Sequence, residues 1–419
     1  MTERSPRWTA TGPGEDIADP RFYTGTRHFE VWQRARRDHP IAWVESGLAG
    51  GFWSVTSHAL GNEVLRQPGT FWSTEGMRLG ASPAAVRAAA GRMLVVSDGA
   101  THRMLRAALS TWFTGRAVAT LHPELERTVD DLLRGILARG TQFDVVEDLA
   151  VRVPMWVLFE MMGVPEADRD ELMRLTATGF DASDGSSEAA QSTAHTAIFA
   201  YFVDLMYQRR ARPGPDMVTS LVQAEVDGRK LTDEEIILNC DGLLNGGLET
   251  TPHAISGAML AFAEHPDAWQ RLRDDDGLTD TAVDEILRWT SPPMQAMRTA
   301  TADAAIGPAQ IQRGDQVVVW LPSCNRDEAA FPAADEFRVD RRPNPHICFG
   351  AGPHYCIGGL LARLELKCFL AALRGLVASI EVTAAPVRQQ SNFLHGLARL
   401  EVQLKPAAGA ILPDTNANG

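Results

Sequence analysis

The residue best placed to do chemistry in this sequence is Cys356, which stands among glycines and directly before a helical pattern. It belongs to the run Phe349-Gly350-Ala351-Gly352-Pro353-His354-Tyr355-Cys356-Ile357-Gly358. Glycines allow a tight backbone that lies against a flat ligand. Backbone N–H groups at the start of the following helix stabilise a thiolate. This setting provides what a sulfur that binds iron requires.

Two other interpretations of this cysteine stay open. Cys356 could be a buried apolar thiol, which is the usual fate of a free cysteine. Four side chains of the same segment could instead bind zinc, although their spacing fits no common zinc pattern: His346, Cys348, His354 and Cys356.

A second group of reactive residues lies inside a long apolar stretch, at Asn245-Gly246-Gly247-Leu248-Glu249-Thr250-Thr251-Pro252. Glycines, an acid and hydroxyls weaken a helix interior, so a functional reason or a simple helix break is expected. Pro252 cannot donate to the carbonyl of Leu248 and predicts a kink. We expect the Thr250 hydroxyl to bond to the Gly246 carbonyl and Thr251 to point away.

The elements that must position these residues are mainly helices. Apolar residues recur at helical spacing over His28 to His39, Ala117 to Gly140, Asp144 to Gly163, Ala189 to Arg210, Asp233 to Glu264 and Gly359 to Ala378. Short strands are predicted over Ile41 to Val44, Phe52 to Thr56, Gln316 to Leu321 and Leu397 to Leu404. Long irregular loops, which often cover or bind something, are predicted over Gln67 to Ser97, Asp181 to Glu188 and Asn325 to Gly358.

Composition narrows the functional classes. The net charge of −13 argues against nucleic acid as a partner. Met1 to Gly14 shows no signal pattern, and no apolar stretch is long enough to span a membrane, so a cytoplasmic protein is expected. The five cysteines are too scattered for a disulfide framework. We expect one domain over residues 1–405, followed by a C-terminal tail over residues 406–419.

The glycine-rich cysteine run resembles the haem-binding loop of the cytochrome P450 superfamily. It matches the pattern Phe-Gly-x-Gly-x-His-x-Cys-x-Gly at every fixed position and continues into Leu-Ala-Arg-x-Glu. The resemblance implies the cytochrome P450 fold, mainly α with small β-sheets that enclose haem b. It implies that Cys356 is the axial ligand of the haem iron and that Phe349, Gly350 and Gly358 contact the cofactor.

Further segments support the resemblance. The pattern Glu-x-x-Arg occurs six times, but only in the copy at Glu285 does another arginine, Arg298, follow ten residues after Arg288. Asn325-Arg326-Asp327 and Phe337-Arg338-Val339-Asp340-Arg341 come next, in the order that the family uses. The resemblance implies that Glu285, Arg288 and Arg341 form a buried ionic cluster that braces the haem loop. It also assigns the haem propionates to His102 and Arg106, which lie four residues apart on one helix face, and to Arg298 and His346.

The Gly246 to Thr251 segment resembles the oxygen-activating helix of the family, which implies that Thr250 holds a water and Glu249 connects it to solvent. By the same resemblance, the substrate pocket is lined by Met93, Leu94, Leu243, Gly246, Met294, Gln295, Phe393 and Leu394. These residues suit a small hydrophobic substrate.

The implied activity is a haem-thiolate monooxygenase that inserts one oxygen atom from O2, by hydroxylation or epoxidation, in secondary-metabolite biosynthesis. The substrate would be free or bound to a carrier protein. A ferredoxin and ferredoxin reductase would supply electrons, with Arg103 as a docking cation. A non-oxygenating haem-thiolate protein, either a peroxide-using enzyme or a ligand sensor, is the alternative, and a zinc-stabilised helical interaction protein is a third.

Overall fold

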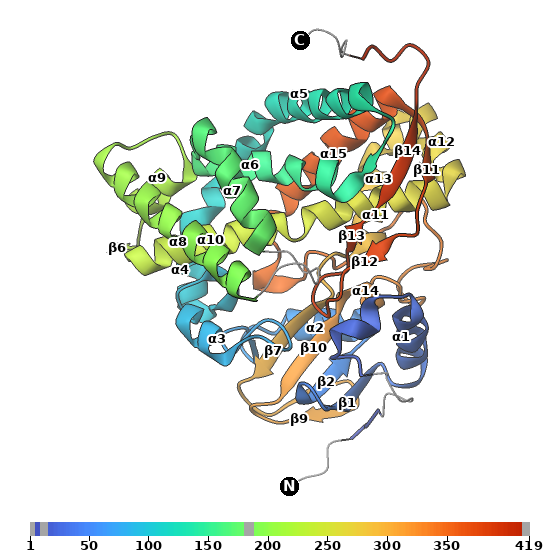
Figure 1. Cartoon of the computed structure of the whole chain (residues 1–419). Coiled ribbons are helices and arrows are strands. Elements are labelled where there is room, and N and C mark those ends of the chain that lie inside the picture. The colour runs from blue at the N-terminus through green and yellow to red at the C-terminus, as the bar shows by residue number, and fades with distance from the viewer. Residues whose placement is uncertain (1–4, 9–15, 180–187, 413–419) are drawn as a thin grey trace.

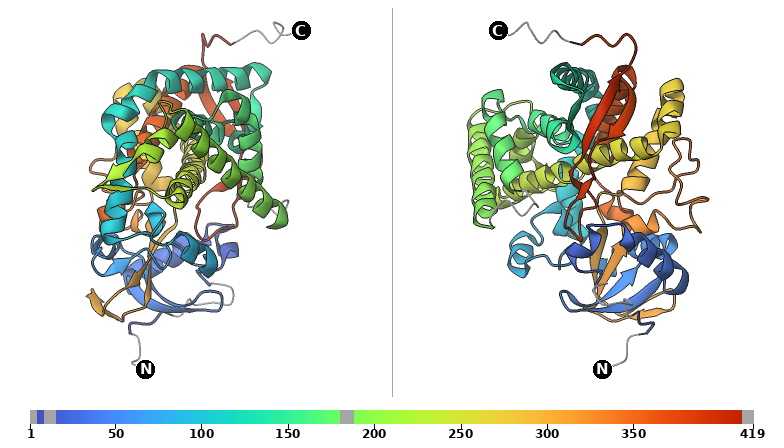
Figure 2. Two further views of the ribbon diagram at one scale, coloured as in Figure 1. Left: turned by 90° about the vertical axis from the view of Figure 1, so that its left-hand side faces the viewer. Right: turned by 45° about the vertical axis from the view of Figure 1, so that its right-hand side comes forward.

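The computed structural model describes residues 5–8, 16–179 and 188–412 of the chain. Helices fill one side of the molecule, and a smaller sheet-rich part lies on the other side (Figures 1 and 2). Its largest sheet has five strands in the order β1-β2-β10-β7-β3. The mainly α fold predicted from the sequence is therefore confirmed.

The helices are α1 (Arg27–Asp38), α2 (His58–Leu65), α3 (Pro83–Ala89), α4 (Gly99–Ser110), α5 (Gly115–Arg139), α6 (Arg152–Met162), α7 (Glu166–Gly179), α8 (Glu188–Ala211), α9 (Met217–Gln223), α10 (Asp233–Leu248), α11 (Thr251–Glu264), α12 (Pro266–Asp274), α13 (Thr279–Thr290), α14 (Leu321–Cys324) and α15 (Gly359–Leu376). The strands are β1 (Ile41–Ser46), β2 (Gly50–Val55), β3 (Phe71–Trp72), β4 (Gln142–Asp144), β5 (Glu225–Val226), β6 (Arg229–Lys230), β7 (Gln295–Ala300), β8 (Ala304–Ile306), β9 (Ala309–Ile311), β10 (Gln316–Trp320), β11 (Val377–Val382), β12 (Val387–Arg388), β13 (Leu397–Arg399) and β14 (Glu401–Pro406).

Helix α5 shows why the amphipathic stretches fold as predicted. It buries Val118, Leu125, Val129 and Leu133, which are seven or four residues apart and so form one apolar face. The Thr114 side chain caps its first turn by accepting a hydrogen bond from the Ala117 N–H. The helix packs against α15, and the loop that carries Cys356 leads directly into α15.

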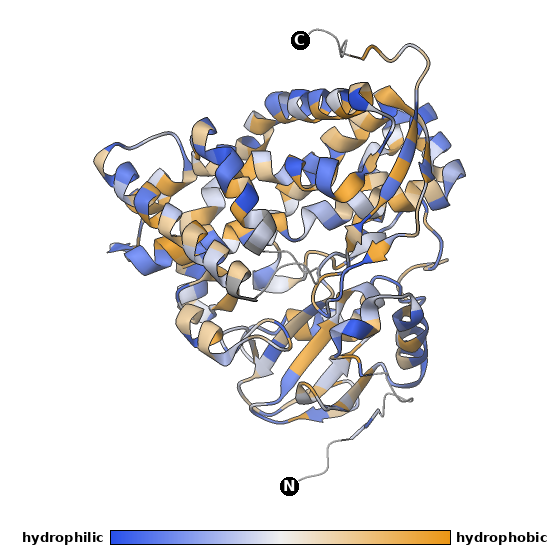
Figure 3. Cartoon of the chain, viewed as in Figure 1, coloured by the Kyte–Doolittle hydropathy of each residue, from blue (hydrophilic) through white to orange (hydrophobic). Residues whose placement is uncertain are grey.

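The five-stranded sheet supplies one of the predicted site residues. Strand β10 runs parallel to β2 and antiparallel to β7, and Val317 of β10 stands opposite Arg298 of β7. The valines of β10 are fully buried and make the strand largely apolar (Figure 3). Strand β7 pairs with β10 on one edge and with β3 on the other. Arg298 therefore has a defined position, although the sequence did not predict this strand.

Several predicted boundaries were wrong. The helix expected over Asp144 to Gly163 begins as a π-helix at Val146–Ala150, before α6. Helix α15 ends at Leu376, and the next residue starts β11. The loop over residues 67–97 contains α3, which is capped by the Ser82 side chain. Residues 181–187 of the second predicted loop lie outside the described part.

The end of the described chain stays in contact with the helices. The Ala407 N–H donates to the Leu376 carbonyl, and Leu412 packs against the main apolar core. Residues 406–412 of the expected tail therefore lie against the body of the protein. Within the described residues, no helix is both long and apolar enough to cross a membrane.

Candidate functional site

The loop around Cys356 is held by its own backbone. The Cys356 N–H donates to the Phe349 carbonyl over 2.9 Å, and the Gly359 N–H at the start of α15 donates to the Cys356 carbonyl over 3.3 Å. Gly350 and Gly352 have φ of 71° and 69°, a region that favours glycine. A Cβ on Gly352 would also lie 2.5 Å from the Leu65 carbonyl oxygen, so no larger residue fits there.

The Cys356 thiol differs from the other four cysteines because it is exposed, whereas they are buried. It lies in a recess, where the surrounding protein raises the pKa of the thiol, while a hydrogen bond from the Gly358 backbone and the charges of Arg106 and Arg363 lower it. The interpretation of Cys356 as a buried apolar thiol is therefore wrong. The reachable sulfur can bind a metal ion that compensates for the lost solvation of its thiolate.

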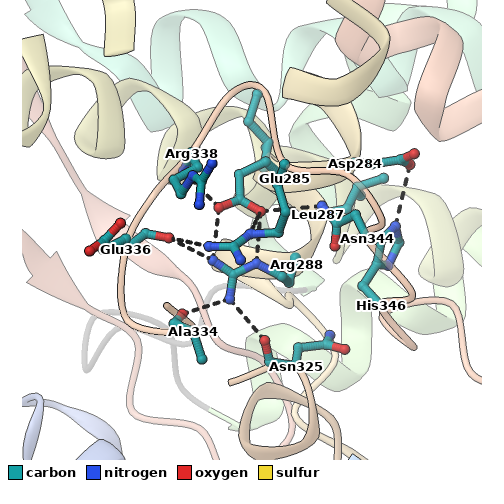
Figure 4. A network of polar contacts seen from close by, with 12 residues as sticks. Asp284, Glu285, Leu287, Arg288, Asn325, Ala334, Glu336, Arg338, Asn344 and His346 are labelled. Atoms are coloured by element: carbon teal, nitrogen blue, oxygen red, sulfur yellow. Dashed lines mark hydrogen bonds and ion pairs between the residues drawn. The ribbon is translucent and has the colours of Figure 1, made fainter. Parts of the chain in front are cut away.

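Glu285 of α13 is the centre of a buried ionic cluster (Figure 4). Its Oε2 accepts hydrogen bonds from Arg288 Nε at 2.7 Å and from Arg341 Nε at 2.9 Å, and its Oε1 accepts one from the Arg338 N–H at 2.7 Å. Arg288 also donates to the carbonyls of Asn325 and Ala334. The cluster thus ties α13 to residues 325–341, the segment that leads into the cysteine loop.

Three of the four residues predicted to hold the propionates come together. His102 and Arg106 lie one turn apart on α4, and the positive charges of Arg106 and Arg298 both act to lower the pKa of His102. His102 Nε2 is buried without a hydrogen-bond partner. Arg298 is 7% exposed and donates only to the neighbouring Met297 carbonyl, and no carboxylate of the described residues pairs with Arg298 or Arg106.

The prediction for His346 was wrong, because the structure turns its ring away from this group. His346 Nε2 lies 3.3 Å from Asp284 Oδ1 on α13 (Figure 4). His354 takes the expected place: its ring centroid is 4.2 Å from that of His102, and its Nε2 is 3.1 Å from Asp98 Oδ1. The position of His354, two residues before Cys356 in the motif, is a signal that could have identified it.

The separate positions of His346 and His354 also contradict the interpretation of this segment as a zinc site. His346 faces Asp284, His354 faces Asp98, and Cys348 is buried with a pKa raised by desolvation. Within the described part of the chain, no three histidine, cysteine or acidic side chains are grouped as metal ligands.

The long helix predicted over residues 233–264 is not continuous. It breaks at Glu249 and Thr250, between α10 and α11, and Pro252 stands in the first turn of α11. The Thr250 hydroxyl donates to the Gly246 carbonyl over 2.7 Å, as predicted. This bond uses the hydroxyl proton, so the free lone pairs of Oγ1 can accept a hydrogen bond from water.

Thr251 points the other way, as predicted: it is buried and faces the carboxyl group of Glu365 on α15. Burial raises the pKa of Glu365 to about 8, although the Thr251 side chain acts to lower it. The two adjacent threonines therefore have different surroundings: Thr250 Oγ1 is partly exposed at the helix break, and Thr251 is buried against α15.

Glu249 directly precedes Thr250, and the pKa of its carboxyl group is raised. Burial raises the pKa of Glu249 to about 7, the charge of Arg78 opposes this shift, and Asp241 adds to it. Arg78 comes from the loop before α3, and its guanidinium carbon lies 5.2 Å from the centre of the Phe393 ring. A carboxyl group with a pKa near 7 can both give and take a proton at neutral pH.

The residues expected to line the substrate pocket divide into two groups. Met93 packs near Gly242 of α10, Phe393 lies under Arg78, and a Cβ on Gly246 would meet only open space. Leu243 and Leu394 are partly buried, and Leu94 is held through its N–H by Asn239. Met93 and Leu94 thus lie against α10, the helix that ends at the break.

Two of the pocket predictions were wrong. Met294 has no exposed surface and packs in the core of the sheet-rich part. Gln295 is buried and uses its amide to bind the Leu79 N–H and the Asn392 carbonyl, which fixes two loops. Neither side chain can touch a substrate without losing these contacts.

Replacing Arg78 with glutamine should raise the pKa of Glu249 further, because a positive charge that favours the carboxylate is lost. Glu249 is protonated below its pKa and ionised above it, so its titration midpoint should move to higher pH. Infrared titration of the carboxyl band, with the Glu249→Gln spectrum subtracted, measures that midpoint. Arg87→Gln on α3 is the control, and an unchanged midpoint in Arg78→Gln would contradict the contact.

The donor set fits the haem that the sequence resemblance implies. A haem presents one iron and two carboxylates, and the site offers one reachable thiol together with cations that lack an acidic partner among the described residues. The unpartnered Nε2 of His102 is a further donor for a carboxylate. Burial lowers the pKa of His102 to about 4 and that of Arg298 to about 10, costs that a bound anion would offset.

Comparisons with known proteins agree with this site. Residues 144–276 and 277–400 match the family described as Cytochrome P450. Cytochrome P450 NovI of Streptomyces niveus is 36% identical over 93% of this chain and 96% of its own length. A steroid C26-monooxygenase of Mycolicibacterium smegmatis is 33% identical over 90% of each chain.

Solved structures show the same relationship. P450 OxyD, which is involved in the biosynthesis of vancomycin-type antibiotics, superposes with a TM-score of 0.87 at 36% identity, covering 94% of this chain and 100% of its own. The similarity to these proteins extends over nearly the whole length of the chain, including the segment that carries Cys356. The chain belongs to the cytochrome P450 family of monooxygenases.

Proposed function

We propose that the protein uses haem b, held by Cys356, to hydroxylate or epoxidise a small hydrophobic molecule in secondary-metabolite biosynthesis. The helix break carries the proposal, because its two consecutive residues supply a carboxyl group with a pKa of about 7, at Glu249, and a hydroxyl, at Thr250. When bound, the haem supplies the iron that activates O2. A non-oxygenating haem protein has no need for such a pair.

The residues of this chain would then have three roles: binding the haem, transferring protons and contacting the substrate. His102, Arg106, Arg298 and His354 would hold the propionates, and the Gly350 and Gly358 backbone and Phe349 would lie against the ring. Thr250 Oγ1 would accept a hydrogen bond from a water, while Glu249 would pass protons between that water and solvent. Met93, Leu243, Gly246, Phe393 and Leu394 would form an apolar wall for the substrate.

Replacing Thr250 with alanine should leave haem and substrate binding intact but raise the hydrogen peroxide released per reduced nicotinamide by about tenfold, since the hydroxyl that holds the proton-delivering water is lost. Thr251→Ala is the matched control and should change coupling far less, because Thr251 faces Glu365. The ratio of product to reduced nicotinamide, with a compound chosen by its shift of the haem spectrum, is the measurement. Coupling lost in Thr251→Ala and kept in Thr250→Ala would contradict the assignment.

The relatives support the substrate class. OxyD is involved in antibiotic biosynthesis, and the mycobacterial relative is a steroid monooxygenase. We therefore propose a small, mostly apolar substrate, free or attached to a carrier protein. The apolar residues around the helix break are consistent with either form.

We propose a ferredoxin, reduced by its reductase, as the electron donor. Arg103 is exposed on α4, next to His102, and offers a positive charge on an otherwise acidic protein. Arg103→Glu should slow reduction by the ferredoxin about tenfold at low salt without changing substrate-binding spectra. Stopped-flow reduction measures the rate, with the exposed Arg127→Glu on α5 as control. Equal rates for Arg103→Glu and the parent would contradict this docking site.

A further inference from the structure

A cavity of about 250 Å³ lies along α11, from His253 to Glu264, and shares no lining residue with the Cys356 site. Its polar and aromatic walls come from α1, α11, α13, β12 and the segments that follow α14 and β12: Phe29, His253, Trp289, Arg326, Arg388 and His395. Thr26 and Glu264 are exposed at its edge. The cavity therefore reaches the surface.

Arg326 is a buried cation with free hydrogen-bonding capacity. Its guanidinium carbon lies 4.2 Å from the centre of the Phe29 ring and 3.8 Å from that of Trp289, so aromatic rings cover both faces. Its Nη1 reaches Asp335 only at 3.5 Å, and its Nε is buried without a partner. Burial lowers the pKa of Arg326 to about 10, which still leaves it charged at neutral pH.

Arg388 adds a second positive charge. Burial lowers its pKa, the nearest opposing charge is that of Glu264 at the edge, and no described carboxylate forms an ion pair with Arg388. The carboxylate of Asp335, which faces Arg326, is itself 60% exposed. The interior of the cavity is therefore positive.

The two histidines of the cavity are neutral. His395 Nδ1 donates to the Thr290 carbonyl over 2.6 Å, so its unpartnered Nε2 is an acceptor. Burial and the charge of Arg388 lower the pKa of His395 to about 3, and burial lowers that of His253 to about 4. His253 Nδ1 is also buried without a partner.

We infer that this cavity binds a small, flat organic acid that carries a hydroxyl group. The carboxylate would pair with Arg326 and Arg388, and the hydroxyl would donate to His395 Nε2. The aromatic walls suit a planar body, and about 250 Å³ lies below the usual range for drug-sized ligands, which points to a single-ring compound.

Calorimetry with 4-hydroxybenzoate tests the site on the intact haem protein. An azole inhibitor that binds the haem iron is kept saturating, so that the Cys356 side is blocked. We expect one molecule to bind per chain. 4-Hydroxybenzamide, which lacks the charge, and benzoate, which lacks the hydroxyl, should each bind at least about tenfold more weakly.

The variants locate the binding. Arg388→Gln should weaken 4-hydroxybenzoate binding at least about tenfold, and Arg388→Lys should recover part of it. Arg399→Gln on β13 is the matched control, because its side chain is 62% exposed and pairs with Asp144 and Glu401 outside the cavity. Absence of binding at millimolar acid would show that the cavity holds only water. Binding of 4-hydroxybenzoate that occurs only without the azole would place it on the Cys356 side and overturn the inference. Equal affinity of Arg388→Gln and the parent for 4-hydroxybenzoate would overturn it as well.

Discussion

Replacing Cys356 with serine is expected to abolish the red-shifted Soret band that a thiolate-bound haem gives when the reduced protein binds carbon monoxide. A serine hydroxyl stays protonated where a thiol ionises, so it cannot supply the anionic sulfur ligand. The surrounding loop should survive, because it is held by backbone bonds such as that from the Cys356 N–H to the Phe349 carbonyl. The carbon monoxide difference spectrum measures the effect.

Cys348 provides the matched control. It lies eight positions before Cys356 in the same segment, but it is buried, and burial raises the pKa of its thiol far above the usual range. Cys348→Ser should keep the red-shifted band. If the Cys348 change removed the band and the Cys356 change did not, the assignment of the iron ligand would be wrong.

Replacing Glu285 with glutamine should destabilise the protein by about 3–5 kcal/mol, because it leaves the buried Arg288 and Arg341 without their counter-charge. Glutamine preserves the shape, so the loss reflects charge rather than packing. Urea denaturation followed by circular dichroism gives the change in unfolding free energy. Haem content should fall as well, since the cluster holds the segment that leads into the cysteine loop.

The pair Glu171 and Arg174 on α7 has the same spacing and an N–O distance of 2.6 Å, but both side chains are largely exposed. Glu171→Gln should therefore leave the denaturation midpoint unchanged, because water solvates both charges. A similar loss of stability in the two variants would contradict the role given to burial.

The sequence predicted the local parts of the fold and site well. The apolar spacing of α5 and the glycine-rich loop depend on neighbours within a few residues, as does the bond from Thr250 to Gly246. A hydroxyl four residues after a free carbonyl can reach it in any helical turn. These features were therefore visible without knowledge of the rest of the chain.

Features that depend on residues far apart in the sequence could not be predicted from it. His346 and His354 lie in one loop, and only the positions of Asp284 and Asp98 decide which ring joins His102. Strand β11 replaced the predicted end of α15 because Val377 pairs with β14, about thirty residues further along the chain.

The pocket predictions show the same dependence. Gln295 was expected to face a substrate, but its amide binds the backbone at Leu79 and Asn392, two loops far away in sequence. Arg78 was missed because nothing in its own loop indicates that it lies over Phe393. Contacts between residues far apart in the sequence therefore decide which side chains line the expected substrate pocket.

The break between α10 and α11 also divides one long helix into two electrical dipoles. The C-terminal, negative end of α10 falls at Leu248 and Glu249, and the N-terminal, positive end of α11 falls at Thr251. An ionised Glu249 is disfavoured at the first pole, in the same direction as its burial. The buried carboxyl of Glu365 faces Thr251 at the second, where the dipole favours negative charge and so opposes the burial that raises the pKa of Glu365 to about 8. The two poles thus act with opposite sign on two carboxyl groups whose pKa values burial raises alike.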